Sequence, residues 1–349
     1  MIFEQIATGG CQSYLIGCSD TCAAALVDPE ISQIDRYLAL ASRHGLRFHY
    51  VIDTHTHADH FSATQQIGHR LRVPIAMHQA SPQPFVDVRL GDRELIVLGR
   101  LRIQVRHTPG HTRDSMCLHV EDRVFTGDTL LIGATGRTDL PTGDPAALHD
   151  SLFNGLLQLD PELKVFPAHD YKGRTYSTLA QELASNPRLQ KRDREEFIEM
   201  MRNLNLSTPT HLTEALRTNM TGGKTVAQLL ADAAAIVPFM SLDGLRTLAD
   251  ARHPDLIVLD VRERDAYDEG HVPGARHLPR GQLELRVNEE LPDPTRRIVT
   301  VCEFGRISTL AAATLRELGF TRVVALDGGM KAWRAADFPL VRGREPYGA

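Results

Sequence analysis

The sequence predicts two globular α/β domains, and three observations lead to that expectation. The chain of 349 residues is long enough for two domains of ordinary size, each with its own hydrophobic core. With 42% hydrophobic and 24% charged residues, the composition is that of a globular protein and excludes a disordered, collagen-like or coiled-coil chain. Short strand-like and helical segments also alternate along the chain, with turn residues between them.

The charge and the cysteine content exclude several classes of protein. The 39 basic and 44 acidic residues give a net charge of -5, so the charge balance does not indicate a nucleic-acid-binding protein. No apolar run approaches the roughly 20 residues that cross a bilayer, and the start Met1-Ile2-Phe3-Glu4 lacks the features of a secretory signal. Five cysteines, an odd number, argue against a disulfide framework. We therefore expect a cytoplasmic protein with small-molecule substrates and no nucleic-acid or membrane partner; its oligomeric state is left open, a homo-oligomer included.

The first domain, residues 1–223, is expected to consist of short strands and turns separated by helices. The strand-like runs are 46–52, 101–105, 116–120, 124–125 and 164–166. Asp144-Pro145 has the residue types of a helix start, and residues 146–157 keep apolar side chains near helical spacing. Residues 185–205 are predicted to be helical, with mixed charges that favour a solvated helix face.

The second domain is expected over residues 239–349, after a linker at 224–238. Its continuous apolar runs are typical of strands buried on both faces, and they cover 256–259, 297–301 and 322–326. The last two runs are each followed by a glycine-containing loop and a helical segment. Strand, loop, helix and strand in this order predict a parallel sheet with helices on its faces.

Residue types that bind metals gather in the first domain. Among 16 histidines, three stand in the stretch His55-Thr56-His57-Ala58-Asp59-His60, directly after a predicted strand. His111, Asp128 and His169 each also follow a predicted strand. If these strands share one sheet, their loops meet at one edge, where ligands can converge on an ion from several directions.

Together these side chains resemble the ligand set of the metallo-β-lactamase superfamily. The resemblance implies an αββα sandwich with the metal site at one edge. In hydrolytic members such as glyoxalase II, the equivalents of His55, His57, Asp59, His60, His111, Asp128 and His169 hold two zinc-like ions. A binuclear zinc thioester hydrolase is therefore one alternative. A non-enzymatic persulfide sensor or sulfur relay is another alternative. A metal-dependent nuclease or lactonase is less favoured, because the sequence indicates no basic groove or added domain for such a substrate.

The sequence between these residues resembles that of the persulfide dioxygenase branch of the superfamily. The similar segments are 126–132, 136–139, 167–171 and Asn203-Leu204-Asn205-Leu206 with Pro209. The resemblance implies one Fe(II) per chain, held by His55, His111 and Asp128. It also implies that the remaining four ligand-type residues, His57, Asp59, His60 and His169, stay outside the coordination sphere and orient ligands and bound water.

Two histidines and one carboxylate on one face of an iron ion leave positions for a sulfur ligand and O2 side by side. The implied reaction converts glutathione persulfide, O2 and water to glutathione and sulfite, with glutathione as co-substrate. Candidates for binding glutathione are the polar residues near the ligands in sequence, Arg113, Arg137, Tyr171, Lys172 and Arg174.

A second informative stretch begins at Cys302, which ends a predicted strand and is followed by the start of a helix. The C-x-x-G-x-x-S spacing places the thiol near free backbone N–H groups at the positive end of a helix dipole, which favours a thiolate. The loop resembles the active-site loop of rhodanese domains, as do residues 259–262, 269–275 and 327–333. This resemblance implies an α/β domain in which Cys302 carries sulfane sulfur as a persulfide and Arg262 supports the loop.

The loop departs from the common rhodanese pattern at two positions. Glu303 and Ile307 stand where many such loops carry a basic residue. We expect Arg306 to supply the missing positive charge and Glu303 to disfavour a dianionic sulfur donor. Joined in one chain, the two domains suggest a persulfide dioxygenase–rhodanese fusion in which the rhodanese half exchanges sulfane sulfur between thiosulfate and glutathione. The other cysteines are expected to be packing residues, namely Cys11, Cys18, Cys22 and Cys117.

Overall fold

The structure is a computed structural model that describes residues 1–204, 206–207 and 212–343. The chain divides into two compact units, Met1–Gly223 and Lys224–Ala349. Asn205 and Pro209 of the motif noted above, and residues 344–349 of the expected second domain, lie outside the described residues. Within the described part of the chain, no helix has the length and apolar character needed to cross a membrane.

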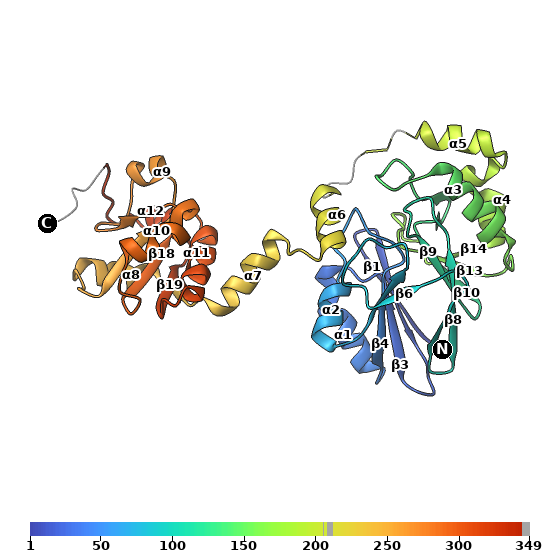
Figure 1. The fold of residues 1–349 in the computed structure, drawn as a ribbon, viewed down its shortest axis with the longest axis horizontal. Helices are drawn as coiled ribbons and strands as arrows, with labels where there is room; N and C mark the ends of the chain where they lie inside the picture. The colour runs from blue at the N-terminus through green and yellow to red at the C-terminus, as the bar shows by residue number, and fades with distance from the viewer. Residues whose placement is uncertain (205, 208–211, 344–349) are drawn as a thin grey trace. The chain divides into compact units, whose positions relative to one another are not determined.

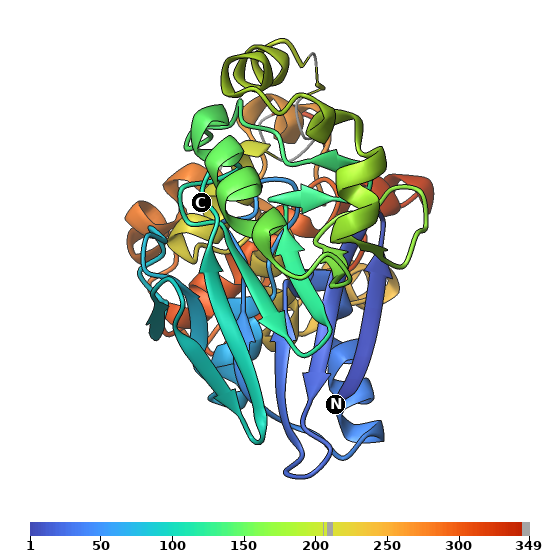
Figure 2. The ribbon, with the colours of Figure 1, turned by 90° about the vertical axis from the view of Figure 1, so that its right-hand side faces the viewer.

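Two six-stranded sheets form the centre of the first unit and face each other in Figure 1 and Figure 2. The first sheet contains, in spatial order, β1 (Ile2–Thr8), β2 (Cys11–Gly17), β3 (Ala23–Val27), β4 (Arg47–Ile52), β5 (Ile75–His78) and β6 (Val88–Leu90). The second contains β14 (Ser177–Thr178), β13 (Lys164–Pro167), β10 (Arg123–Gly127), β9 (Met116–Val120), β8 (Leu101–His107) and β7 (Leu95–Leu98). A small hairpin pairs β11 (Leu130–Leu131) with β12 (Ala134–Thr135).

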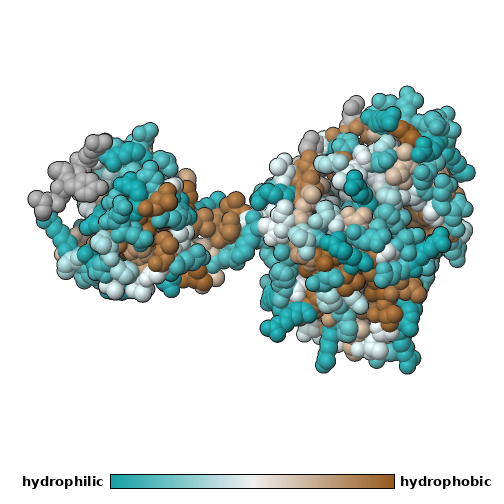
Figure 3. Space-filling view, viewed as in Figure 1, coloured by the Kyte–Doolittle hydropathy of each residue, from teal (hydrophilic) through white to brown (hydrophobic). Residues whose placement is uncertain are grey.

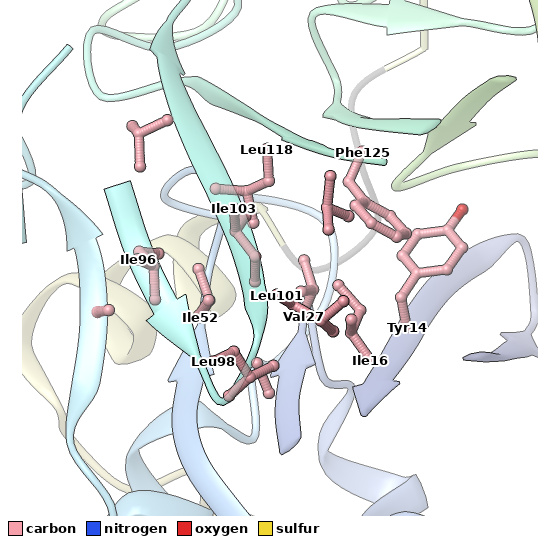
Figure 4. Packing of buried hydrophobic residues seen from close by; sticks show 14 of the residues in the cluster. Tyr14, Ile16, Val27, Ile52, Ile96, Leu98, Leu101, Ile103, Leu118 and Phe125 are labelled. Atoms are coloured by element: carbon pink, nitrogen blue, oxygen red, sulfur yellow. The ribbon is translucent and has the colours of Figure 1, made fainter. Parts of the chain in front are cut away.

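The core of this unit lies between the sheets. Tyr14 and Ile16 of the first sheet pack in one buried cluster with Ile103 and Phe125 of the second, as Figure 4 shows. Each such side chain, fully buried, contributes about 1.5–3 kcal/mol to stability. The alternate side chains of each sheet face outward and are covered by helices: α1 (Ile34–Arg43) and α2 (Thr64–Leu71) on the first sheet, α3 (Pro145–His149), α4 (Leu179–Ser185) and α5 (Arg194–Arg202) on the second. The expected αββα sandwich is confirmed.

The helices of the second layer are shorter than the sequence predicts. The expected helix 146–157 stays α-helical only to His149 and continues as a π-helical turn over Asp150–Gly155 and a 3-10 turn over Leu156–Gln158. The expected helix 185–205 is interrupted because Pro187 cannot continue α4. Helix α5 begins only after Asp193, whose carboxylate accepts a hydrogen bond from the Glu196 amide.

The second unit contains a five-stranded sheet in which every adjacent pair of strands is parallel, as expected. Its strands, in spatial order, are β15 (Phe239–Met240), β19 (Arg322–Leu326), β18 (Arg297–Val301), β16 (Leu256–Asp260) and β17 (Arg276–His277). One face packs against α7 (Val226–Ile236), α10 (Leu283–Glu290) and α11 (Arg306–Glu317). The other packs against α8 (Leu242–Asp250), α9 (Arg264–Glu269) and α12 (Gly329–Ala335).

Residues 224–238, expected as a linker, contain α7 and belong to the second unit. The helix starts with a capping box, because the Thr225 hydroxyl accepts from the Gln228 amide at 3.1 Å and the Gln228 side chain accepts from the Thr225 amide at 2.6 Å. Ala233 and Val237 are buried in the same cluster as α11. The linker expectation is therefore wrong.

The distribution of apolar residues in α7 explains why the sequence did not predict a helix here. Val226, Leu229 and Ile236 are 62%, 45% and 52% exposed, and brown atoms cover this helix in Figure 3 at the place that Figure 1 gives it. Apolar residues on the exposed side as well as the buried side remove the alternation of polar and apolar faces by which an amphipathic helix is recognised.

The packing of α7 predicts how the second unit responds to a buried charge. Ala233→Asp places an unpartnered carboxylate where the side chain is 5% exposed, and we expect it to destabilise this unit by about 3 kcal/mol. The single tryptophan, Trp333, is buried in the same unit, so its fluorescence during urea unfolding of the full chain reports this transition. Ala235→Asp on the exposed side of α7 is the control, with an expected change below about 0.5 kcal/mol. Equal effects of the two variants would contradict the packing.

Candidate metal centre and cysteine loop

The predicted ligands come from loops that follow four strands, but these strands belong to two sheets. The loop with His55 follows β4 in the first sheet, whereas His111, Asp128 and His169 follow β8, β10 and β13 in the second. The condition considered in the sequence analysis, that one sheet carries all four loops, is therefore not met. The loops meet instead where the ends of both sheets face each other, and the Met116 amide donates a hydrogen bond to the Thr54 carbonyl there at 2.9 Å.

His55, His111 and Asp128 form a compact group at this edge. One ring nitrogen of each histidine and one carboxylate oxygen lie within 4.8 Å of one another. His111 Nε2 is 3.6 Å from Asp128 Oδ2. Both imidazoles are buried, and the carboxylate is 13% exposed. Two nitrogen donors and one oxygen donor around a common point are a donor set that suits a divalent transition metal.

The hydrogen bonds of the two histidines fit a bound metal ion. His111 Nδ1 lies 2.8 Å from the Arg137 carbonyl, which can only accept, so Nδ1 carries the hydrogen and Nε2 keeps its lone pair. His55 Nδ1 contacts the Thr54 hydroxyl at 3.0 Å, and its buried Nε2 has no hydrogen-bond partner among the described residues. Burial and the neighbouring His57 lower the pKa of His55 to about 3, which keeps the ring in its neutral, metal-binding form.

Two glycines allow the backbone to approach these side chains. Gly127, directly before Asp128, has a φ of +50°, a conformation that side chains with a Cβ rarely adopt. A Cβ on Gly136 would lie 2.0 Å from the Asp128 carbonyl oxygen and 2.9 Å from His111 Cβ. Both positions therefore require glycine for the ligand geometry, which gives a physical reason for the Thr-Gly-Asp-Thr and Gly-Arg-Thr-Asp segments.

A second group lies beside the first and shares the Asp128 carboxylate with it. His169 Nδ1 is 2.6 Å from Asp128 Oδ1, and His169 Nε2 is 2.7 Å from Asp59 Oδ2. Burial alone would lower the pKa of His169, but these two carboxylates raise it well above its ordinary value. His60 Nδ1 adds a contact of 3.2 Å to Asp59 Oδ1. The four residues are therefore already joined by ion pairs.

Cys11 belongs to this second group, although it was expected to be a packing residue. Its sulfur and ligand atoms of Asp59, His60 and His169 all lie within 4.8 Å of one another. Burial opposes ionisation, but the His169 and His60 imidazoles outweigh it and lower the pKa of Cys11. The residue is far from the other members in sequence, so no spacing rule pointed to it. Of the remaining expected packing cysteines, Cys18 and Cys117 are buried and Cys22 is exposed.

Hydrogen bonds with Asp28 and Asn219 hold the histidine-rich loop, residues 55–60, in place. His57 Nε2 lies 3.2 Å from Asp28, which also accepts hydrogen bonds from the Thr54 amide and hydroxyl at 2.7 and 2.9 Å. From α6 (Leu212–Thr221), Asn219 donates to the carbonyls of His57 and His60, both at 2.8 Å. Neither Asp28 nor Asn219 stands in a metal-binding pattern, so sequence reasoning did not single them out.

A cavity of about 740 Å³ opens onto the first two groups, within the range of small-molecule sites. Its lining includes Cys11, Asp59, His111, Asp128 and His169 together with Arg137, Tyr171 and Arg188. Of the five residues expected to bind glutathione, Arg137 and Tyr171 line the cavity. The other three, Arg113, Lys172 and Arg174, are not among its lining residues.

The arginines near the cavity differ in what they already bind. Arg174 donates to the Asp170 carboxylate and the Ile132 carbonyl, which makes it a support of its own loop. Arg137 donates to Asp139 at 2.6 and 2.7 Å. Arg188, which the sequence analysis did not select, donates through Nη1 to the Thr135 carbonyl at 2.6 Å and to the Thr135 hydroxyl at 3.2 Å.

In the second unit, Cys302 lies between β18 and α11, as the sequence predicts. Its Sγ accepts a hydrogen bond from the Ser308 amide in the first turn of α11 at 3.2 Å and lies 3.3 Å from the Ser308 hydroxyl. The Met330 and Lys331 amides of α12 donate to the carbonyls of Cys302 and Glu303, both at 2.9 Å, and so fix the loop backbone. The thiol therefore faces amides at the positive end of a helix dipole.

The charges around this loop differ from the expectation. The Glu303 carboxylate is 3.4 Å from Arg262 Nη1 and also pairs with Arg334, so two guanidinium groups neutralise it. Arg262 itself is buried and bound to Asp260 at 2.7 Å. Arg306 is exposed at the start of α11. The cations that balance Glu303 are therefore Arg262 and Arg334, and the sequence analysis had not identified Arg334.

Comparison with known proteins matches each unit to a family. Residues 6–169 match the model of the metallo-beta-lactamase superfamily, and residues 242–336 match the rhodanese-like domain. The chain is 35% identical over 213 residues to the mitochondrial persulfide dioxygenase ETHE1 of Mus musculus, covering 60% of this chain and 84% of that protein. The crystal structure of ETHE1 from Myxococcus xanthus superposes with a TM-score of 0.62 at 39% identity and covers 64% of this chain and 100% of its own.

A third similarity extends over both units. The structure of a metallo-beta-lactamase from Staphylococcus aureus covers 93% of this chain and 98% of its own, with a TM-score of 0.60. At 21% identity it shows the fold alone. Both resemblances drawn from the sequence, to the metallo-β-lactamase superfamily with its persulfide dioxygenase branch and to rhodanese domains, are confirmed.

The first group predicts which histidine the metal content depends on. We expect His111→Ala to weaken metal binding at least about 100-fold, because it removes one of three converging donors. Metal per chain, measured by plasma mass spectrometry after dialysis, checks this. His119→Ala is the control, because that ring lies on β9 and contacts the Glu121 carbonyl instead. A His111→Ala protein with its full metal content would refute the donor assignment.

Proposed function

Because the chain belongs to the persulfide dioxygenase family of the metallo-β-lactamase superfamily and carries a rhodanese-like domain, we propose that it oxidises glutathione persulfide and transfers sulfane sulfur. In the first unit, glutathione persulfide, O2 and water give glutathione and sulfite. In the second unit, sulfane sulfur is exchanged between thiosulfate and glutathione. Glutathione persulfide, the product of the second reaction, is then the substrate of the first.

The observation that carries the proposal is the separation of the two metal-binding groups. His55, His111 and the Asp128 oxygen that faces His111 offer donor atoms, whereas Asp59 already pairs with both His60 and His169, and His169 pairs with the other Asp128 oxygen. This arrangement favours one ion per chain over the two zinc ions of a thioester hydrolase. We assign that ion as Fe(II), which when bound supplies the chemistry that joins O2 to a sulfur ligand.

The remaining residues of the site position the reactants and a proton. His169, protonated between Asp59 and Asp128, holds one oxygen of Asp128 so that the other faces His111. It also keeps a proton next to the cavity, where the developing sulfite and thiolate need compensation for their negative charge. Asn219 and Asp28 fix the loop of His55 and His57 and thereby hold the donors in position.

The cavity also has the groups that a glutathione moiety needs. Arg188 has N–H groups directed to no described acceptor and lies in the lining, so it is our candidate for a glutathione carboxylate. Tyr171 lies over the Gly9-Gly10 turn, with its ring stacked on His169 at 6.0 Å between centroids, and supplies an exposed aromatic surface. Arg137, bound to Asp139, also lines the cavity.

In the second unit, Cys302 attacks the outer sulfur of thiosulfate and releases sulfite, which leaves a persulfide on the enzyme. The glutathione thiolate then takes this sulfur and restores the Cys302 thiolate, so no net oxidation occurs. The pairing of Glu303 with two arginines bears on the choice of donor. A neutralised carboxylate does not repel a dianion, so Glu303 is compatible with thiosulfate as the donor, contrary to the expectation from the sequence.

The proposed division of labour predicts separable activities. Asp128→Ala should abolish O2 uptake with glutathione persulfide and remove the metal, while leaving sulfur transfer from thiosulfate unchanged. Cys302→Ser should abolish sulfur transfer from thiosulfate and leave O2 uptake and metal content unchanged, since its thiol is the nucleophile of the second unit only. Oxygen-electrode and sulfite assays on the same preparations, with metal analysis, check this. Two zinc ions per chain together with thioester hydrolysis and no O2 uptake would favour the hydrolase instead.

The ion pairs of Glu303 predict how thiosulfate binding depends on Arg334. Arg334→Ala should raise the KM for thiosulfate about two- to fivefold, because one of two cations that neutralise Glu303 is lost. The double variant Glu303→Gln/Arg334→Ala should return the KM close to that of the wild type. If the double variant stays impaired, Arg334 binds the donor directly and the neutralisation argument is incorrect.

A further inference from the structure

We propose that Cys11 is a sulfur-carrying residue of the first unit, one that takes the sulfane sulfur of an incoming low-molecular-weight persulfide and holds it in the cavity for oxidation. This inference rests on the proposed persulfide oxidation and goes beyond it, because it makes the oxidised species a protein-bound persulfide. Its basis is the position of the thiol, its neighbours and its access to the cavity.

The backbone fixes Cys11 next to the metal-binding groups. Cys11 begins β2 and forms an antiparallel bridge with His169 at the end of β13. The Gln12 amide donates to the Ala168 carbonyl at 2.7 Å, and the Asp170 amide donates to the Gly10 carbonyl at 2.9 Å. These bonds join the start of β2 in the first sheet to the segment that follows β13 in the second sheet, so the thiol is held by the scaffold rather than by a single loop.

The side chain of Cys11 faces the same cavity as two of the proposed metal ligands. It lines that cavity with His111 and Asp128, and His169 of the Cys11 group contacts Asp128 at 2.6 Å. Cys11 is also accessible, with intermediate burial, whereas Cys117 is buried completely. Among the described cysteines of the first unit, it is the one that lines this cavity.

His60 provides an independent observation at the same place. This ring is 8% exposed, its Nδ1 lies 3.2 Å from Asp59, and its buried Nε2 has no hydrogen-bond partner among the residues described. One edge of the imidazole is therefore paired and the other is open within the cluster that contains Cys11. An imidazole beside a thiol is the arrangement found in nucleophilic cysteines, where the ring stabilises the thiolate.

The proposed step is a thiol–persulfide exchange with no net oxidation. The Cys11 sulfur attacks the outer sulfur of the donor persulfide, a new S–S bond forms, and the S–S bond of the donor breaks. The donor leaves as a thiolate and takes up the proton that Cys11 has lost. Oxidation of the carried sulfur by O2 with water then releases sulfite and restores the Cys11 thiol, with the same stoichiometry as the reaction proposed above.

A labelling experiment on the metal-loaded full chain tests the exchange step. In a Cys302→Ser background without oxygen, the protein is treated with glutathione persulfide, separated from small molecules, alkylated and digested for mass spectrometry. We expect the mass of one additional sulfur atom on the Cys11 peptide, well above the level on the exposed Cys22 peptide, which serves as the internal control. Admission of oxygen should remove this sulfur and release an equal amount of sulfite.

The matched variants Cys11→Ser and Cys22→Ser complete the test. Cys11→Ser should keep its metal and lose O2 uptake with glutathione persulfide by at least about tenfold, whereas Cys22→Ser should be unchanged. Absence of the sulfur label from Cys11 would overturn the inference, as would full O2 uptake by Cys11→Ser. Loss of metal from Cys11→Ser would also overturn it, because the residue would then be a metal ligand. A wild type that takes up no oxygen refutes the proposed function separately, since the anaerobic labelling reports the exchange alone.

Discussion

The arrangement of the first unit depends on how the carboxylate of Asp128 is shared. One of its oxygens lies 2.6 Å from His169 and the other 3.6 Å from His111. The contact with His169 orients the carboxylate, so the second oxygen is directed toward His111. Two histidines of the same site, His55 and His169, thus have different protonation states. His55 is kept neutral by burial, and His169 is kept charged by two carboxylates.

Burial makes this sharing necessary, because a charge that is removed from water is tolerated only when it is paired. Asp59 pairs with both His60 and His169, and Cys11 joins them at the start of β2. The cluster therefore has its charges balanced before any substrate arrives. What it leaves available is the set of donor atoms on His55, His111 and Asp128 and the cavity above them.

The two units stabilise a negatively charged sulfur in different ways. In the first, a proposed metal ion would provide the positive charge that stabilises a sulfur anion, and side chains hold the ion. In the second, backbone amides at the start of α11 face the Cys302 sulfur, while Arg262 and Arg334 neutralise the one nearby acid. Both sites follow the carboxyl ends of strands, where loops converge.

The sequence by itself determined the residues whose chemistry requires a particular type at a particular spacing. These are the histidine-rich loop at 55–60, the residues after each later strand, and Cys302 with its glycine and serine. Only the tertiary structure decided which strands share a sheet, that residues 226–236 form a helix, and that Cys11, Arg188 and Arg334 lie beside the sites. The physical reason is that spacing within a segment is encoded locally, whereas contacts between β2 and β13, or between a loop and α12, arise from packing across distant parts of the chain.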